Sequence, residues 1–210
     1  IIEPLDLALA ITPFNHPLNQ VIHKIAPAIS AGTPIILKPS EKTPLSAYRL
    51  RDILSKCGLP DEAFVVVNGF DLKETVKNLV SSHFFDVVSF TGSYEVGIQI
   101  EEMMIKNKNF LKKYIPELGG NAALVVDKEA DLELASNIAL SAFDNCGQRC
   151  TSVKRILLFN SVAEEFIKLF TNKTSKLKYG DPYDKKNDLG TVIDRYAASK
   201  IKNVVDSAIS

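Results

Sequence analysis

The sequence lacks an excess of either charge, a long hydrophobic run and a cysteine framework. Lysine plus arginine number 25, as do aspartate plus glutamate, so there is no global basic footprint and we expect no nucleic-acid partner. No apolar run approaches the roughly 20 residues that cross a bilayer, so we expect no membrane association. The three cysteines, Cys57, Cys146 and Cys150, form no disulfide framework and favour a reducing, cytoplasmic location.

The N-terminus has neither a basic region nor a starting methionine. The first absence argues against a signal peptide, and the second is typical of a piece of a longer protein. The 210 residues suffice for one large core or two smaller ones, and 46% hydrophobic with 24% charged residues is ordinary for a globular protein.

Several common motifs are absent as well. No G-x-G-x-x-G fingerprint follows the first expected strand, and no G-x-S-x-G elbow of a serine hydrolase occurs. The segment 92–97 has the glycine spacing of a P-loop, but Ile98 stands where lysine is required. Cys146 and Cys150 have no nearby cysteine or histidine pair, so we expect no metal site.

What is present is an alternation of strand-like and helical patterns. Strands are expected at 7–11, 34–37, 64–67, 87–90, 122–126 and 153–159. Helical patterns occur at 18–29, from 43 to 58, at 71–80, after Ser93, and at 131–142, 162–170 and 195–209. The polar stretch 107–113 is interpreted as a solvated loop or a frayed helix end. This alternation predicts an α/β fold with a parallel sheet covered by helices on both faces.

Functional-looking residues follow four of the expected strands. These residues are Asn15, Lys38, Gly69 and Ser93. Parallel α/β sheets bind ligands beyond the carboxyl ends of their strands, so we expect a ligand site at this edge.

The segment 145–151, Asn-Cys-Gly-Gln-Arg-Cys-Thr, places a cysteine between a helical and a strand-like run. A deprotonated thiol facing a cleft at such a junction is a good nucleophile, and the alternative is a buried structural cysteine. The upstream carboxylate Glu117, together with Asn15 and Lys38, favours a catalytic role for Cys150.

Five segments in a fixed order resemble the aldehyde dehydrogenase superfamily. They are Pro13–Asn19, Lys38–Pro44, Phe90–Ser93, Glu117–Gly120 and Gly147–Thr151. The resemblance implies a modified dinucleotide-binding parallel sheet joined to part of a second α/β catalytic domain. It assigns 1–117 to the later part of the cofactor-binding domain and 118–210 to the first part of the catalytic domain. Full members are much longer, contain a later Glu-x-Phe-Gly-Pro motif and form homodimers or homotetramers.

The resemblance also implies catalytic roles. Cys150 matches the nucleophile that forms a thiohemiacetal and then a thioester, and Asn15 matches the side-chain donor to the oxyanion. Glu117 matches the general base that activates water, which favours hydrolysis to a free acid over acylation of coenzyme A. Lys38 matches the lysine that binds the cofactor ribose.

The implied cofactor is NAD. Glu41 matches a carboxylate that accepts from the adenosine ribose hydroxyls and repels a 2′-phosphate, although neighbouring Lys42 weakens the preference over NADP. Ser93 and the following helix N-terminus are expected to hold the pyrophosphate. The full cofactor set is Ile11, Thr12, Pro13, Phe14, Lys38, Ser40, Glu41, Gly69, Phe90, Thr91, Gly92, Ser93, Val96, Leu118 and Gly119.

The expected substrate is a small aldehyde that carries an anionic group. His16 and Arg149 adjoin catalytic positions, and arginine can bind phosphate, phosphonate or carboxylate in a bidentate manner. Asn15 and Thr151 complete the substrate set. The stretch 147–155 is similar to the phosphonoacetaldehyde dehydrogenase branch, while oxidisers of glyceraldehyde-3-phosphate or semialdehydes are close competitors. The alternative is that both side chains point away from the substrate.

Two other classes stay open. The chain could be a fragment with the family fold and no independent activity, or a structural member such as some lens crystallins. Joint retention of Asn15, Lys38, Glu117 and Cys150 argues against the structural class, because that role does not require all four.

Overall fold

The computed structural model describes residues 3–69, 71–108 and 111–210 and divides into two compact units, Ile1–Gly119 and Gly120–Ser210. The strands of the first unit are β1 (Ala8–Ile11), β2 (Ile35–Lys38), β3 (Phe64–Val66), β4 (Val87–Thr91) and β5 (Lys113–Glu117). Its helices are α1 (Asn19–Ser30), α2 (Leu45–Lys56), the short 3₁₀ helix η1 (Asp61–Ala63), α3 (Leu72–Ser81) and α4 (Tyr94–Lys106).

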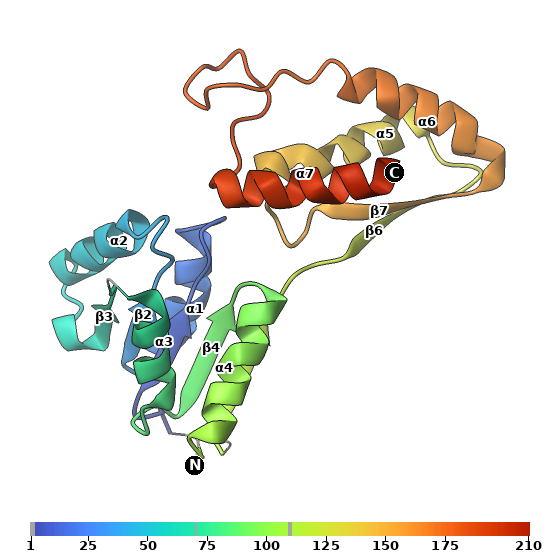
Figure 1. Ribbon diagram of the computed structural model, residues 1–210. Coiled ribbons are helices and arrows are strands. Elements are labelled where there is room, and N and C mark those ends of the chain that lie inside the picture. Colours follow the sequence, from blue (N-terminus) through green and yellow to red (C-terminus); the bar gives the residue numbers. More distant parts are fainter. Residues whose placement is uncertain (1–2, 70, 109–110) are drawn as a thin grey trace. The chain divides into compact units, whose positions relative to one another are not determined.

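The five strands form one sheet in the order β3-β2-β1-β4-β5, and every neighbouring pair is parallel (Figure 1). The predicted α/β class with a parallel sheet is therefore confirmed. The chain runs outward from β1 to β3 and then returns to place β4 on the other side of β1. This reversal creates a topological switch point between β1 and β4, where open α/β sheets bind their ligands.

Helices cover both faces of this sheet, as the alternation predicted. One core joins Ala8 and Ala10 of β1 with Val21 and Ile25 of α1 and with Ala47 of α2. The alternate residues of β1, Leu9 and Ile11, point to the opposite face. There the core includes residues of α4, the end of α3 and the loop that follows α3. That second core contains Leu9, Ile11, Val80, Phe85, Val88, Phe90, Ile100 and Met104. The period of two along β1 thus supplies both layers.

Strand β5 corrects the sequence interpretation, which assigned 107–113 to a loop or helix end. Residues 109–110 lie outside the described part, but Lys113 begins a strand that pairs with β4. The strand was missed because four of its five residues are exposed and Pro116 interrupts the β pattern. Proline is tolerated here because, within the described residues, β5 pairs only with β4. The Lys113 N–H donates toward that side, so the nitrogen of Pro116, an odd number of residues later, points away from the ladder.

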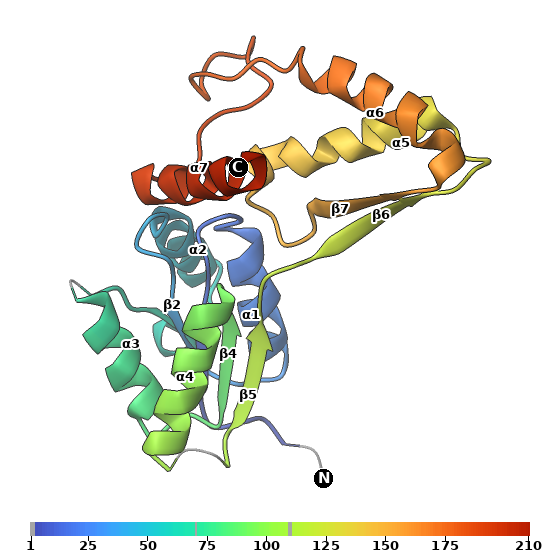
Figure 2. The same cartoon turned by 45° about the vertical axis from the view of Figure 1, so that its right-hand side comes forward.

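The second unit contains β6 (Ala122–Val126), α5 (Leu132–Leu140), η2 (Ser141–Gly147), β7 (Val153–Leu158), α6 (Asn160–Thr174) and α7 (Arg195–Ile209). Strands β6 and β7 pair in parallel, and α5 and α6 pack over them (Figure 2). Phe166 is buried in their core, and Phe170 stacks between Phe166 and Phe143. Helix α6 extends beyond the predicted 162–170 at both ends.

Lys173 near the end of α6 ties that helix to α5. Its ammonium donates to the Glu133 carbonyl oxygen (3.1 Å), Glu133 Oε2 (2.6 Å), Ser136 Oγ (2.8 Å) and Asn137 Oδ1 (2.7 Å). The side chain is only 20% exposed, and Ser136 is fully buried. One partly buried charge therefore links α6 to a buried hydroxyl and to two exposed side chains of α5.

We expect Lys173→Met in the full-length protein to lower the free energy of unfolding by about 2 kcal/mol, because charge-assisted hydrogen bonds to α5 are lost. Chemical denaturation would measure the change, and amide hydrogen exchange should rise in α5 and α6. Lys176→Met is the matched control, because Lys176 is exposed and lies in the turn directly after α6. Equal effects of the two substitutions would contradict this role of Lys173.

Candidate active site

The register of the first sheet brings the carboxyl ends of its strands to one level. Ile11 at the end of β1 pairs with Lys38 of β2 and with Phe90 of β4, and Phe90 pairs with Pro116 of β5. Backbone bonds continue this alignment into the loops. The Thr12 N–H donates to the Lys38 carbonyl oxygen (3.2 Å), and the Gly92 N–H donates to the Glu117 carbonyl oxygen (3.1 Å). The predicted residues at these strand ends are therefore neighbours along one edge.

Lys38 and Glu41 form an ion pair at this edge. Lys38 Nζ lies 3.4 Å from Glu41 Oε2, and the side chains are 7% and 36% exposed. A buried ammonium is costly without partners, and this is its one polar contact among the described residues. Lysine has three N–H donors, so Lys38 retains donors for a ligand, while the more exposed Glu41 retains acceptor capacity.

The loop after β1 carries Thr12, Pro13, Phe14, Asn15 and His16. Thr12 is 4% exposed, and its Oγ1 is buried without a hydrogen-bond partner among the described residues. The next four residues are half-buried. The Thr43 hydroxyl donates to the Phe14 carbonyl oxygen (3.4 Å), which links this loop to the segment after Lys38.

The N-terminus of α4 lies after β4 at the switch point. Ser93 caps the helix by accepting from the Val96 N–H (3.3 Å), and both residues are exposed. The free N–H groups of a first turn and the helix dipole favour an anion at such an end. Of the other expected cofactor residues, Thr91 is buried, Ser40 is buried, Leu118 and Gly69 are half-buried, and Gly119 is exposed.

Lys24 of α1 is a residue that the sequence interpretation missed. Its Nζ donates to Ser89 Oγ of β4 (2.8 Å), on the sheet face that also carries Glu117. Burial lowers the pKa of Lys24 to about 8, and the negative charge of Glu117 acts in the opposite direction. The sequence carried a sign that Lys24 is partly buried, because it lies three residues after buried Val21 on the apolar side of α1.

Cys150 lies in a turn of the second unit between η2 and β7. It is half-buried, and all three cysteines are free. Arg149 Nη1 donates to Asp144 Oδ2 (3.1 Å), and Arg149 Nε is buried without a partner among the described residues. Thr151 is exposed. The sequence interpretation did not identify Asp144 as the partner of Arg149.

Gly120 supports the turn from the segment between β5 and β6. A Cβ atom at Gly120 would lie 1.7 Å from the carbonyl oxygen of Cys150, a distance that no side chain can accept. The second glycine of the Glu-Leu-Gly-Gly segment is thus required by close approach to the cysteine. Gly119 beside it has open space at the same position.

Other features of the structure add no site. No group of three or more histidine, cysteine, aspartate or glutamate side chains able to hold a metal occurs in the described ranges. Among the same residues, no helix is both long and apolar enough for a membrane span. A cavity of about 510 Å³ between α2 and β3 is lined by Arg51, Asp52 and Asp61, and includes none of the predicted site residues.

Comparisons with known proteins cover the whole chain. The model of the aldehyde dehydrogenase family matches residues 1–210. The 3-sulfolactaldehyde dehydrogenase of Priestia aryabhattai is 38% identical over 207 residues, covering 98% of this chain and 42% of that protein. The crystal structure of an E. coli NADP-dependent enzyme is 36% identical with a TM-score of 0.92, covering 99% of this chain and 42% of that one. A Pseudomonas syringae aldehyde dehydrogenase mutant (C291A) with NAD+ and octanal has the same TM-score of 0.92, 29% identity and coverages of 99% and 42%.

We expect Gly120→Ala to lower the free energy of unfolding by about 2 kcal/mol, because the added methyl group overpacks against Cys150. Amide hydrogen exchange should rise at 149–152. The matched control is Gly119→Ala, for which no atom lies within 4 Å of the new Cβ. Similar effects of both substitutions would show that the Gly120–Cys150 approach does not constrain the turn.

Lys24 also predicts a pH dependence of stability. Its folded pKa of about 8 lies below the ordinary 10.5, so the unfolded chain binds more protons between these values. Wild type should therefore gain stability relative to Lys24→Met as pH rises from about 8 toward 10.5, measured by urea unfolding. Lys73→Met, at an exposed position of α3, should show no such trend against wild type. If the difference in free energy of unfolding between wild type and Lys24→Met stays constant with pH, the shifted pKa of Lys24 is contradicted.

Proposed function

Because the chain belongs to the aldehyde dehydrogenase family, we propose that the protein containing it oxidises an aldehyde to a carboxylic acid with a nicotinamide dinucleotide. The observation that carries the proposal is the family match over residues 1–210. The chain spans 42% of the length of the relative from Priestia, so the activity is proposed for the whole protein.

Cys150 is the proposed nucleophile. Its thiolate adds to the aldehyde carbon, and the carbonyl oxygen becomes an oxyanion that needs hydrogen-bond donors. The Asn15 side-chain amide and the Cys150 N–H are the proposed donors, each worth about 3–4 kcal/mol by analogy with other oxyanion holes. The half-buried turn that holds Cys150 against Gly120 supports this role.

Glu117 is the proposed base for the second half of the reaction. It removes a proton from the water that attacks the thioester, which releases the acid and restores the Cys150 thiol. The exposed position of Glu117 at the end of β5 is compatible with access to water.

The residues at the sheet edge fit a dinucleotide. Buried Thr12 Oγ1 lacks a partner among the described residues, Lys38 has donors to spare and the first turn of α4 offers N–H groups. We propose that Lys38 and Glu41 hold ribose hydroxyls and that Ser93 with α4 holds the pyrophosphate. The carboxylate of Glu41 favours NAD over NADP. When bound, the dinucleotide supplies the hydride acceptor.

The proposed substrate carries an anionic group and is similar to phosphonoacetaldehyde. Asp144 occupies one N–H of Arg149, while the buried Nε has no partner among the described residues, so the guanidinium has capacity for an anion. His16 is the second proposed contact. The name of the Priestia relative, a 3-sulfolactaldehyde dehydrogenase, supports an anionic aldehyde, because a sulfonate, like a phosphonate, is a tetrahedral anion.

Three further expectations stay predictions. The first unit is proposed to bind the cofactor and the second to belong to the catalytic domain. The full-length protein is proposed to form a homodimer or homotetramer, and the small number of free cysteines favours the cytoplasm.

NADH formation by the full-length protein tests the function. We expect activity with phosphonoacetaldehyde, succinic semialdehyde or glyceraldehyde-3-phosphate, and weaker activity with propanal. Arg149→Ala should raise KM for the preferred anionic aldehyde about tenfold to a hundredfold, the value of one or two charge-assisted hydrogen bonds, with little change for propanal.

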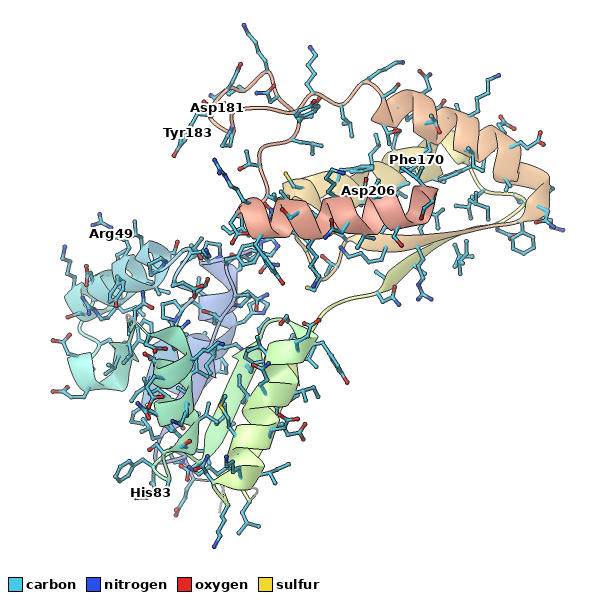
Figure 3. All side chains as sticks on the ribbon, in the orientation of Figure 1. Arg49, His83, Phe170, Asp181, Tyr183 and Asp206 are labelled. Carbon is cyan, nitrogen blue, oxygen red and sulfur yellow. The ribbon has the colours of Figure 1, made fainter. Side chains whose placement is uncertain are left out.

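Two controls separate charge recognition from loop structure. Arg49→Ala removes an exposed arginine of α2 (Figure 3) and should leave all four KM values unchanged. Asp144→Asn removes the ion pair but keeps Arg149 available for an anion. Failure on all four aldehydes would overturn the substrate class, and an equal effect of Arg149→Ala on propanal would overturn the anion site.

A further inference from the structure

The loop before Cys150 has a backbone that local sequence disfavours. Asn145 has φ 51°, Cys146 has φ 55° and Gly147 has φ 73°, so three consecutive residues are left-handed. Glycine adopts this region freely and asparagine often does, but cysteine does so rarely. Such a run persists only where surrounding contacts hold it.

Gln148 makes two of those contacts with its side chain. Its Oε1 accepts from the Ile193 N–H (2.8 Å), a residue 45 positions later in the chain. Its Nε2 donates to the Asn145 carbonyl oxygen (2.9 Å), which also accepts from the Gln148 backbone N–H (3.1 Å). The side chain therefore fixes the left-handed run to the segment that precedes α7.

Cys150 is held on its other side as well. The carbonyl oxygen of Cys150 packs against Gly120. Before Gln148, Lys154 Nζ donates to the Gly147 carbonyl oxygen (2.9 Å). The short stretch 148–150 is thus anchored before and after the cysteine. The direction of the Cys150 thiol depends on both anchors, because only Arg149 lies between Gln148 and Cys150.

We propose that Gln148 is a positioning residue for Cys150, in which one amide couples the cysteine turn to Ile193. The expected effect on catalysis rests on the proposed function. The effect of Gln148 on the reactivity of the Cys150 thiol can be measured separately. An amide is required because the site needs an acceptor for the Ile193 N–H and a donor to the Asn145 carbonyl at once. A carboxylate supplies only the acceptor, and a thioether supplies neither at comparable strength.

Two variants of the full-length protein test the proposal. Gln148→Met conserves size and removes both hydrogen bonds, so the rate constant for iodoacetamide with Cys150 and kcat should each fall about tenfold or more. Gln148→Glu keeps the acceptor but turns a second oxygen toward the Asn145 carbonyl. A glutamate is ionised at neutral pH and cannot donate, so the alkylation rate of this variant at pH 7 should also fall about tenfold relative to wild type.

The controls distinguish positioning from general damage. Gln99→Met changes an exposed glutamine of α4 and should leave the alkylation rate unchanged. The KM for NAD should stay near wild type in both Gln148 variants. If Gln148→Met fails to fold, the alkylation rate of Gln148→Glu at pH 7 still decides the role of the donor.

Two results would overturn the positioning role. One is a Gln148→Met variant whose alkylation rate and kcat lie within twofold of wild type. The other is a Gln148→Glu variant whose alkylation rate at pH 7 lies within twofold of wild type. Absence of NADH formation by wild type, with the alkylation pattern as expected, would support the positioning of Cys150 and count against the proposed function alone.

Discussion

Parallel pairing of β1 with β2 on one side and β4 on the other is the interaction on which the first unit depends. It places the ends of the strands at one level and brings the loops after them together at the switch point. Because both faces of β1 are buried, a shift of register by one residue would move every core side chain to the wrong face. The same packing that stabilises the sheet therefore also fixes the positions of Lys38, Thr12 and Ser93.

Two ammonium groups are taken out of water at this sheet, and their different partners suit different tasks. Lys38 is nearly buried and paired with Glu41, so its charge is compensated by a carboxylate on the next turn of chain. Lys24 has a neutral hydroxyl as its direct partner, and burial lowers its pKa to about 8. The pKa of Lys24 therefore lies closer to neutral pH than that of an ordinary lysine, while Lys38 keeps N–H donors for a ligand.

The second unit stabilises a cysteine turn that would not form alone. Left-handed Asn145 and Cys146 are held by Gln148, and the carbonyl of Cys150 fits against Gly120. Lys173 fastens α5 to α6 through polar contacts, while Phe143 stacks on Phe170 and ties η2 to the same helix. Rigid elements on both sides of the turn thus hold a reactive group that a flexible loop would leave poorly directed.

The sequence by itself determined the α/β class, most of the strands and helices, and the family segments. These features depend on local spacing, which the chain carries in every environment. Only the tertiary structure decided that 113–117 is a strand, because an exposed edge strand has no buried pattern of its own. The tertiary structure alone showed the contacts of Lys24 with Ser89, of Gln148 with Ile193 and of Gly120 with Cys150. The partners in these pairs are 65, 45 and 30 positions apart, and no local pattern in the sequence encodes a contact at such separations.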